Sequence, residues 1–248
     1  MGSPMETQRP ANAASRAKSP MQKDLNQPDS VSKPTAIQVA NPATQFWKQW
    51  IALQLKHNLE KMVELSIKNF HFTGLNYVCF EFSPTQTIRL YIVNPVDNLD
   101  TENVQIHNHL YDSQILVLHG WVRNRVYHVA NDESDYNLYN LTSALHPDNH
   151  ERKIKLQFLR KKGLTVVKDL KLMPGDSHFQ KHTEIHNVQN DPTQLTAFMV
   201  FEFPTVKKHS VLFTKKDLGD TIATPNCYLR YEPEELRSLV QGLLDQMD

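Results

Sequence analysis

The clearest indication of the fold is the stretch Ile106-His107-Asn108-His109, followed by Ser113-Gln114-Ile115-Leu116-Val117-Leu118-His119-Gly120. Its second part is an apolar run that ends at a glycine, which is typical of a buried strand closing on a turn. We therefore expect a β-hairpin that turns at Gly120. Side chains alternate between the two faces of a strand, so His107 and His109 project from the same face. Two imidazoles in that arrangement can bind one metal ion as neighbouring ligands.

The chain around this stretch is divided into many short runs that alternate with period two and are separated by turn residues. Such a pattern predicts a β-sandwich or barrel. Residues 130–162 are interpreted as an insertion between the two halves of that barrel. The runs cover residues 75–82, 87–93, 104–109, 113–118, 122–129, 153–159, 164–172, 195–203 and 210–213.

Helices are predicted at both ends of the β region. Apolar residues spaced three and four apart follow Asn41-Pro42, which indicates an amphipathic helix that docks on a sheet. A second helix is predicted to start at Pro233, with acidic residues in its first turn. Residues 1–40 contain no aromatic residue and are expected to be a disordered tail. Residues 41–248 are expected to form a single domain.

Composition restricts the function classes. The 27 basic residues equal the 27 acidic ones, so we expect no nucleic-acid partner. No apolar run is long enough to span a bilayer, so we expect no membrane partner and a cytoplasmic location. Cys79 and Cys227 are too few for a disulfide scaffold and are interpreted as reduced thiols, with a single bridge as the alternative.

A second window runs from Pro174-Gly175-Asp176 to His186-Asn187-Val188-Gln189-Asn190. Together the two windows resemble the two motifs of the cupin superfamily. His107, His109, Gly120, Gly175, His186 and Asn190 match in order, whereas Lys181 and Thr183 replace the usual proline and glycine. The resemblance implies a mainly β fold, the cupin double-stranded β-helix or jelly-roll barrel. It also implies a metal site of His107, His109 and His186, with Asn190 among the residues that orient the imidazoles.

Ser113 or Gln114 stands where most cupins place a metal-binding glutamate. A site of three histidines is characteristic of the thiol dioxygenases, such as cysteine dioxygenase, and these proteins are similar to this chain in both metal segments. The resemblance implies Fe(II) as cofactor, with Zn, Ni or Mn as alternatives. It also implies a small-molecule substrate and O₂ as partners, and cupins often form homodimers.

The chain departs from the thiol dioxygenases in the strand after the second motif. That strand reads Phe201-Glu202-Phe203-Pro204, where cysteine dioxygenases carry a His-x-Tyr pair. Oxidation of cysteine itself is therefore not expected, and a different substrate or a lost activity follows more naturally.

Two further residues are candidates for catalysis. Arg89 lies on an early strand where thiol dioxygenases place an arginine for the substrate carboxylate, and its planar guanidinium suits that task. The alternative is a solvated or ion-paired strand arginine. If the hairpin turns near Gly120, alternation places His128 on one face with Val126 and Asn124, near the metal. A structural histidine is the alternative for His128.

Other interpretations stay open at this point. His178, His182 and His186 are spaced four apart, which on a helix would line one face and suggest a zinc site, although the HExxH order is absent. For the function, the alternatives to a non-haem iron dioxygenase are a non-catalytic binding or sensor module and a Zn, Ni or Mn isomerase or hydrolase.

Overall fold

The computed structural model describes residues 42–70, 74–83, 85–95, 106–131, 135–145, 152–219 and 228–247. The expected tail of residues 1–40 and Cys227 lie outside these ranges, and the expected division into domains stays a prediction. In chain order the elements are α1 (Pro42–His57), α2 (Leu59–Leu65), β1 (Leu75–Phe82), β2 (Thr87–Val93), β3 (Ile106–His107), β4 (Tyr111–His119), β5 (Val122–Ala130), β6 (Tyr136–Leu145), β7 (Arg152–Leu172), β8 (Ser177–Gln180), β9 (Ile185–Asn190), β10 (Thr196–Thr205), β11 (Ser210–Thr214) and α3 (Pro233–Gln246).

The strands form two sheets. One has the order β1-β2-β10-β4-β8, and the other, β11-β3-β9-β5-β7-β6, closes on itself. Within them, β2-β10-β4-β8 and β3-β9-β5-β7 are antiparallel throughout and form the two four-stranded sheets of a jelly roll. The predicted fold class, a mainly β jelly-roll barrel with a helix before it and a helix after it, is confirmed.

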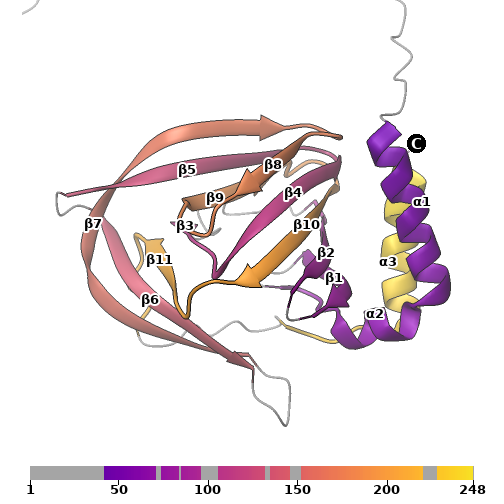
Figure 1. Ribbon diagram of the computed structural model, residues 1–248, viewed down its shortest axis with the longest axis horizontal. Coiled ribbons are helices and arrows are strands. Elements are labelled where there is room, and N and C mark those ends of the chain that lie inside the picture. Colours follow the sequence, from indigo (N-terminus) through magenta and orange to yellow (C-terminus); the bar gives the residue numbers. More distant parts are fainter. Residues whose placement is uncertain are drawn as a thin grey trace, which may run out of the picture. The chain divides into compact units, whose positions relative to one another are not determined.

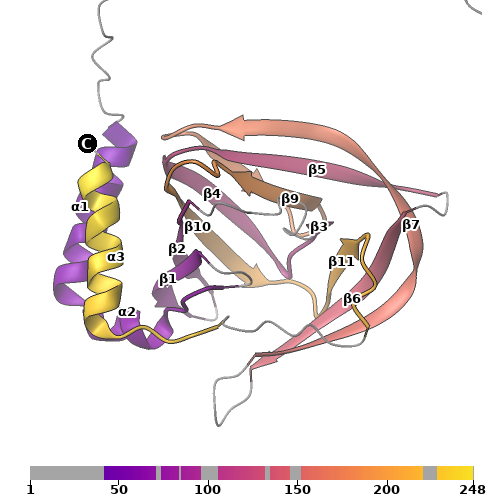
Figure 2. The same cartoon turned by 180° about the vertical axis from the view of Figure 1, so that it is seen from behind.

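The three helices of the described residues lie along one side of the β structure, next to β1 and β2 (Figures 1 and 2). Alternation along β2 explains the attachment, because Leu90 and Ile92 are fully buried in a core shared with Ile51 of α1 and Leu236 of α3. Each such side chain contributes about 1.5–3 kcal/mol when buried. Since successive residues of a strand face opposite sides, Arg89 and Tyr91 project to the other face of the sheet, into the interior of the jelly roll. No helix among the described residues is long and apolar enough to cross a bilayer.

The turn predicted at Gly120 is present, but the expected β-hairpin is not, because β4 pairs with β10 and β8 whereas β5 pairs with β7 and β9 in the other sheet. β4 ends at His119 and β5 begins at Val122, and Gly120 has φ +70°, in the left-handed region that glycine tolerates best. A Cβ atom there would lie 2.7 Å from Thr196 Oγ1 and 2.8 Å from the Leu195 carbonyl oxygen. The turn therefore requires glycine both for its backbone conformation and for the close approach of β10.

The region interpreted as an insertion is a long hairpin. The two runs 153–159 and 164–172 form one continuous strand, β7, and the polar segment before them contains a strand, β6, that the sequence pattern did not reveal. β7 pairs with β6 along its first half and with β5 along its second half. Its register shifts twice, at residue 159 against β6 and at residue 167 against β5, and such bulges bend a strand. β7 consequently curves around the outer side of the molecule (Figure 1).

Candidate metal centre

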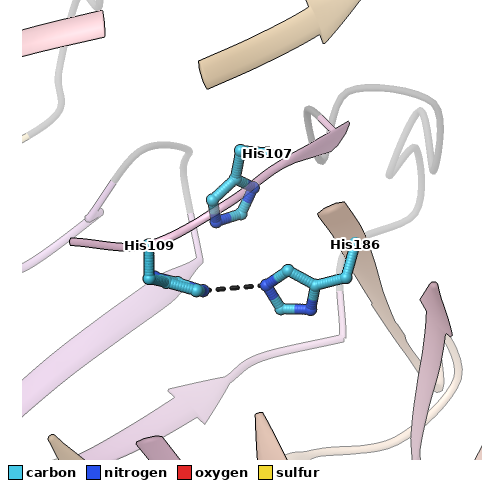
Figure 3. A group of neighbouring side chains, drawn as sticks. All are labelled: His107, His109 and His186. Carbon is cyan, nitrogen blue, oxygen red and sulfur yellow. Dashed lines mark hydrogen bonds between the residues drawn. The ribbon is translucent and has the colours of Figure 1, made fainter. Parts of the chain in front are cut away.

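Three histidines from two distant segments of the chain meet inside the jelly roll. His107 on β3 is the direct partner of His186 on β9, and His109 lies two residues beyond the end of β3. Their rings converge on one small volume, with the His109 and His186 imidazoles edge to edge and His107 beside them (Figure 3). One candidate ligand atom from each lies within 4.8 Å of the other two. The structure therefore brings together all three residues that the sequence suggested as ligands.

The spacing of the nitrogens fits a shared ion. His109 Nε2 and His186 Nε2 are 2.8 Å apart. Two imidazole nitrogens bound about 2.1 Å from one ion, at angles between 90° and 109°, lie roughly 3.0–3.4 Å apart. The observed 2.8 Å is slightly shorter than this separation, so binding an ion requires the two nitrogens to move slightly apart. The group contains imidazoles alone, since no carboxylate of the described residues belongs to it.

Burial also favours the neutral, metal-binding form of His186. The residue is 2% exposed. Desolvation is the largest cause that holds the pKa of His186 well below its ordinary value, and the neighbouring His107 and His178 lower it further. An uncharged imidazole keeps a lone pair for a metal ion.

The opposite nitrogen of His186 is fixed by a neighbour on β5. His186 Nδ1 lies 2.8 Å from Asn124 Oδ1, and Asn124 is fully buried. Asn124 shares its face with Val126, as alternation predicted, but the sequence assigned it no role. A hydrogen bond of this kind orients the imidazole, so that Nε2 faces His109.

A charged and aromatic cluster lies next to the histidines. The Tyr111 ring centroid is 5.4 Å from that of His109 on one side, and the Arg89 guanidinium carbon lies 5.8 Å from the Tyr111 ring centroid on the other. Burial raises the pKa of the Tyr111 phenol well above its ordinary value, although Arg89 opposes the effect. Tyr111 therefore stays protonated and links the histidine group to Arg89.

Arg89 is ion-paired inside the protein. Its Nη2 atom lies 2.5 Å from Glu202 Oε2, and the two side chains are 13% and 5% exposed. Nη1 donates to the Tyr91 hydroxyl at 3.4 Å, whereas Nε is buried and has no hydrogen-bond partner among the described residues. Of the two expectations for Arg89, the ion-paired arginine matches the structure.

A recess of about 320 Å³ opens beside this ion pair. Arg89, Glu202 and Tyr111 lie in its wall, and Phe203 supplies apolar surface. The remaining lining residues are Phe82, Ser83, Gln86, Thr87 and Thr205. The recess therefore borders Tyr111, the residue that contacts His109.

The structure corrects the expected place of His128. β5 continues past its last pairing with β9, Tyr127 with Ile185, so His128 extends beyond the strand that holds His186 and is paired only with Thr165 on β7. Its side chain is exposed and lies outside the histidine group. Alternation along β5 was inferred correctly, but the length of the partner strand could not be read from the sequence.

Two other expectations are also corrected. Asn190 donates to the carbonyl oxygen of Asp191, and Asn124 is the residue that contacts His186. The helical reading of the three histidines spaced four apart is wrong, because His178 lies on β8 and His186 on β9. His182, between these strands, pairs with Asp112 instead, with Nδ1 2.7 Å from Oδ1.

The residues that the sequence analysis missed carry weak signals. Ser113, in the position of the usual cupin glutamate, is paired in register with Glu202 on β10, so a carboxylate stands on the neighbouring strand. Glu202 is two residues from the inward-facing Val200, so the two side chains share a face and Glu202 also points inward. Only the strand pairing shows which residues Glu202 faces. Tyr111 follows His109 by two residues, which is a signal that the same alternation rule could have used.

No protein-family model matches the chain, and no curated protein matches it. Among solved structures, it is similar to a hydroxypropylphosphonic acid epoxidase from S. wedmorenis, with 14% identity and a TM-score of 0.34 over 57% of each chain. It is also similar to a structure described as DMSP lyases, with 12% identity and a TM-score of 0.28 over 52% of this chain and 47% of that one. A third is Streptomyces albus HEPD with 2-hydroxyethylphosphonate and Fe(II) bound, with 9% identity and a TM-score of 0.33 over 57% of this chain and 25% of that one.

The match spans little more than half of the first of these chains, and the scores are too low to support a statement about activity. The architecture rests on the strand order of this chain itself. The protein is a jelly roll, the architecture that cupins share, with three converging histidines in its interior.

Proposed function

We propose that the protein is a mononuclear metal-dependent enzyme, a non-haem Fe(II) dioxygenase acting on a small substrate that carries a thiol or a carboxylate. The convergence of His107, His109 and His186, without a carboxylate in the group, is the observation that carries the proposal. Imidazole nitrogens suit iron as well as zinc, nickel and copper, and three ligands leave positions for substrate and O₂. The resemblance of both metal segments to thiol dioxygenases supports iron over the others.

When bound, iron would supply the redox chemistry with O₂. The protein itself would orient the metal ligands and exclude water from the site. His186 is held neutral by burial and fixed by Asn124. The apolar side chains expected to exclude water are buried, with Ile115 at 4%, Val117 at 0% and Val126 at 6% exposure. Val126 is the direct partner of His186 across β5 and β9, so one side of the site is apolar.

The recess beside Tyr111 is the proposed place for the polar end of the substrate. Arg89 lines the recess, and its Nε is a buried donor without a hydrogen-bond partner among the described residues. A substrate carboxylate would have to compete with Glu202, which already neutralises Arg89. Within the proposed substrate class, the recess therefore favours a small thiol over a carboxylate.

A non-catalytic binding module is the second candidate. The Arg89–Glu202 pair favours it, because the position expected to bind a substrate carboxylate is occupied by a carboxylate of the chain itself. Phe201 and Phe203 stand where thiol dioxygenases carry a His-x-Tyr pair. A Zn, Ni or Mn isomerase or hydrolase could use the same three imidazoles.

Elemental analysis of protein purified without a histidine tag tests the metal. We expect about one iron per chain in the wild type and in His57→Ala, a matched control because His57 is exposed on α1. His107→Ala and His109→Ala should lose the metal while keeping the β-rich circular dichroism spectrum. Full metal content in folded histidine variants would overturn the site.

The identity of the metal and oxygen consumption then separate the candidate functions. Oxygen uptake by the iron-loaded protein with a panel of small thiols and carboxylates supports the dioxygenase. Stoichiometric zinc or nickel without oxygen uptake supports the isomerase or hydrolase. Protein that takes up no metal after anaerobic loading with Fe(II) supports the binding module.

A further inference from the structure

A buried line of hydrogen bonds runs from His186 to a carboxylate near the surface. His186 Nδ1 contacts Asn124 Oδ1 at 2.8 Å, Asn124 Nδ2 donates to Gln180 Oε1 at 2.8 Å, and Gln180 Nε2 donates to Glu184 Oε2 at 3.0 Å. Asn124 and Gln180 are both fully buried. Each amide uses its oxygen toward His186 and its nitrogen toward Glu184, so all bonds of the line point the same way.

The carboxylate at the end of this line sets its direction. A carboxylate only accepts hydrogen bonds, so Gln180 must turn its NH₂ group to Glu184 and its oxygen to Asn124. Asn124 must then donate to Gln180, which leaves only its oxygen for His186. An oxygen accepts and cannot donate, so His186 must carry its proton on Nδ1. The lone pair of His186 consequently lies on Nε2, the nitrogen that faces His109.

Reversing the line carries a penalty. If His186 were protonated on Nε2, Asn124 and Gln180 would both have to flip, and the Gln180 oxygen would face the Glu184 oxygen. One buried amide hydrogen bond would be lost, at about 1–3 kcal/mol. That difference corresponds to a preference of roughly 5- to 150-fold for the proton on Nδ1, since 1.4 kcal/mol is a factor of ten.

The line also connects different parts of the fold. Asn124 lies on β5, Gln180 ends β8 in the other sheet, and Glu184 lies in the tight turn before β9. Glu184 is anchored there, because its Oε2 also accepts from the backbone N–H of Lys181 at 3.0 Å and its own N–H donates to the Lys181 carbonyl oxygen at 3.0 Å. The acceptor that ends the line is therefore held in place by its own turn.

We propose that Glu184 acts through Gln180 and Asn124 as a positioning residue that holds His186 in the tautomer with its lone pair on Nε2, ready to bind metal. This inference rests on the proposed function, in which His186 is a metal ligand. Glu184 itself is not placed at the metal and does not belong to the histidine group. A purely structural role would require only that the buried amides be satisfied, in either direction.

Nitrogen NMR of metal-free protein with ¹⁵N-labelled histidine tests the tautomer directly, with His186 assigned from the spectrum of His186→Gln. In the wild type we expect His186 to show a protonated Nδ1 and an unprotonated Nε2. In Glu184→Gln the new amide can donate or accept, both directions of the line become satisfied, and we expect both tautomers. Glu60→Gln, an exposed change on α2, is the matched control and should leave the spectrum unchanged.

A second change should restore the single tautomer. Asn124→Asp in the Glu184→Gln background places an acceptor-only group directly against His186 Nδ1, so the direction is set without Glu184. We expect this double variant to show only the proton on Nδ1. A wild type with the proton on Nε2, or a folded Glu184→Gln variant that keeps a single tautomer, would overturn the inference.

Metal titration gives a second readout. If Glu184→Gln populates the two tautomers equally, the apparent Kd for the ion should rise about twofold, because only half of the molecules are competent. The tautomer experiment contains no metal, so its outcome is independent of the metal site. If the tautomers are as expected but the protein binds no metal, the proposed function is refuted and the inference about Glu184 stands. If the protein binds metal but His186 carries its proton on Nε2, the inference about Glu184 is refuted and the metal site stands.

Discussion

The ion pair between Arg89 and Glu202 gives a prediction whose size follows from burial. Both side chains are almost fully enclosed, at 13% and 5% exposure. Removing one member of a buried pair leaves an uncompensated charge, which costs about 3–5 kcal/mol. We expect Glu202→Leu and Arg89→Met each to lower the free energy of unfolding by that amount. At roughly 2–4 °C per kcal/mol for a domain of this size, Tm should fall by about 6–20 °C.

Removing both members together should cost much less than the sum. In Arg89→Met with Glu202→Leu, no charge is left without a partner, and apolar replacement of a buried pair is often close to neutral. Urea unfolding of the wild type, both single variants and the double variant forms a double-mutant cycle. Glu234→Gln is the control, because its ion pair with Arg237 is exposed and should contribute less than about 1 kcal/mol.

Two outcomes would refute this reasoning about the ion pair. Single variants that lose less than about 1 kcal/mol would mean that solvent reaches the pair. A double variant as unstable as the sum of the two single ones would mean that Arg89 and Glu202 do not stabilise each other, because independent changes add.

Four further predictions concern other parts of the molecule. Gly120→Ala should destabilise the protein by more than about 1 kcal/mol, since φ is +70° and a Cβ atom would meet Thr196 and Leu195. Urea unfolding measures this loss of stability, and an unchanged midpoint would contradict the turn geometry. Burial lowers the pKa of His186, so the unfolded chain binds a proton at this residue before the folded protein does as pH falls below about 6.5. The free energy of unfolding should therefore decrease from pH 7 to 5, by up to about 1.4 kcal/mol per pH unit. Denaturant unfolding of His186→Gln across that range should show a weaker dependence on pH. Divalent metal at 100 times its Kd should add about 2.7 kcal/mol to the wild type, measured by thermal unfolding with and without a chelator, and nothing to His109→Ala. His128→Ala should keep full metal content by elemental analysis, because the side chain is exposed, and loss of the metal would return His128 to the site.

The parts of the fold that depend on local pattern could be predicted from the sequence. The apolar run after His109 and the glycine at 120 identified a strand and its turn, and the spacing of apolar residues identified α1 and α3. β6 escaped prediction because its asparagines and its polar flanks resemble a loop. The sequence pattern also failed to predict that two runs form the single strand β7, because Gly163 is a typical turn residue but lies inside a paired strand.

The candidate site shows the same division. The three histidines were found because each belongs to a motif with fixed spacing. Asn124, Gln180 and Glu202 were missed because their roles depend on partners 56 to 113 residues away, which only strand pairing brings together. The expectation for His128 failed for a related reason, since alternation determines the face of a strand but not where the neighbouring strand ends.

The contact between His109 and His186 has a consequence for the order of folding. The two residues are separated by 77 positions, and the intervening chain contains β4 to β8. Contacts between residues so far apart in the chain tend to form slowly, so we expect the histidines to meet only after most of the jelly roll has formed. A nascent chain that ends before β9 lacks the third imidazole and the strand that carries it. An ion held by all three would tie the early and late halves of the chain together, and the complex should unfold more slowly than the metal-free protein.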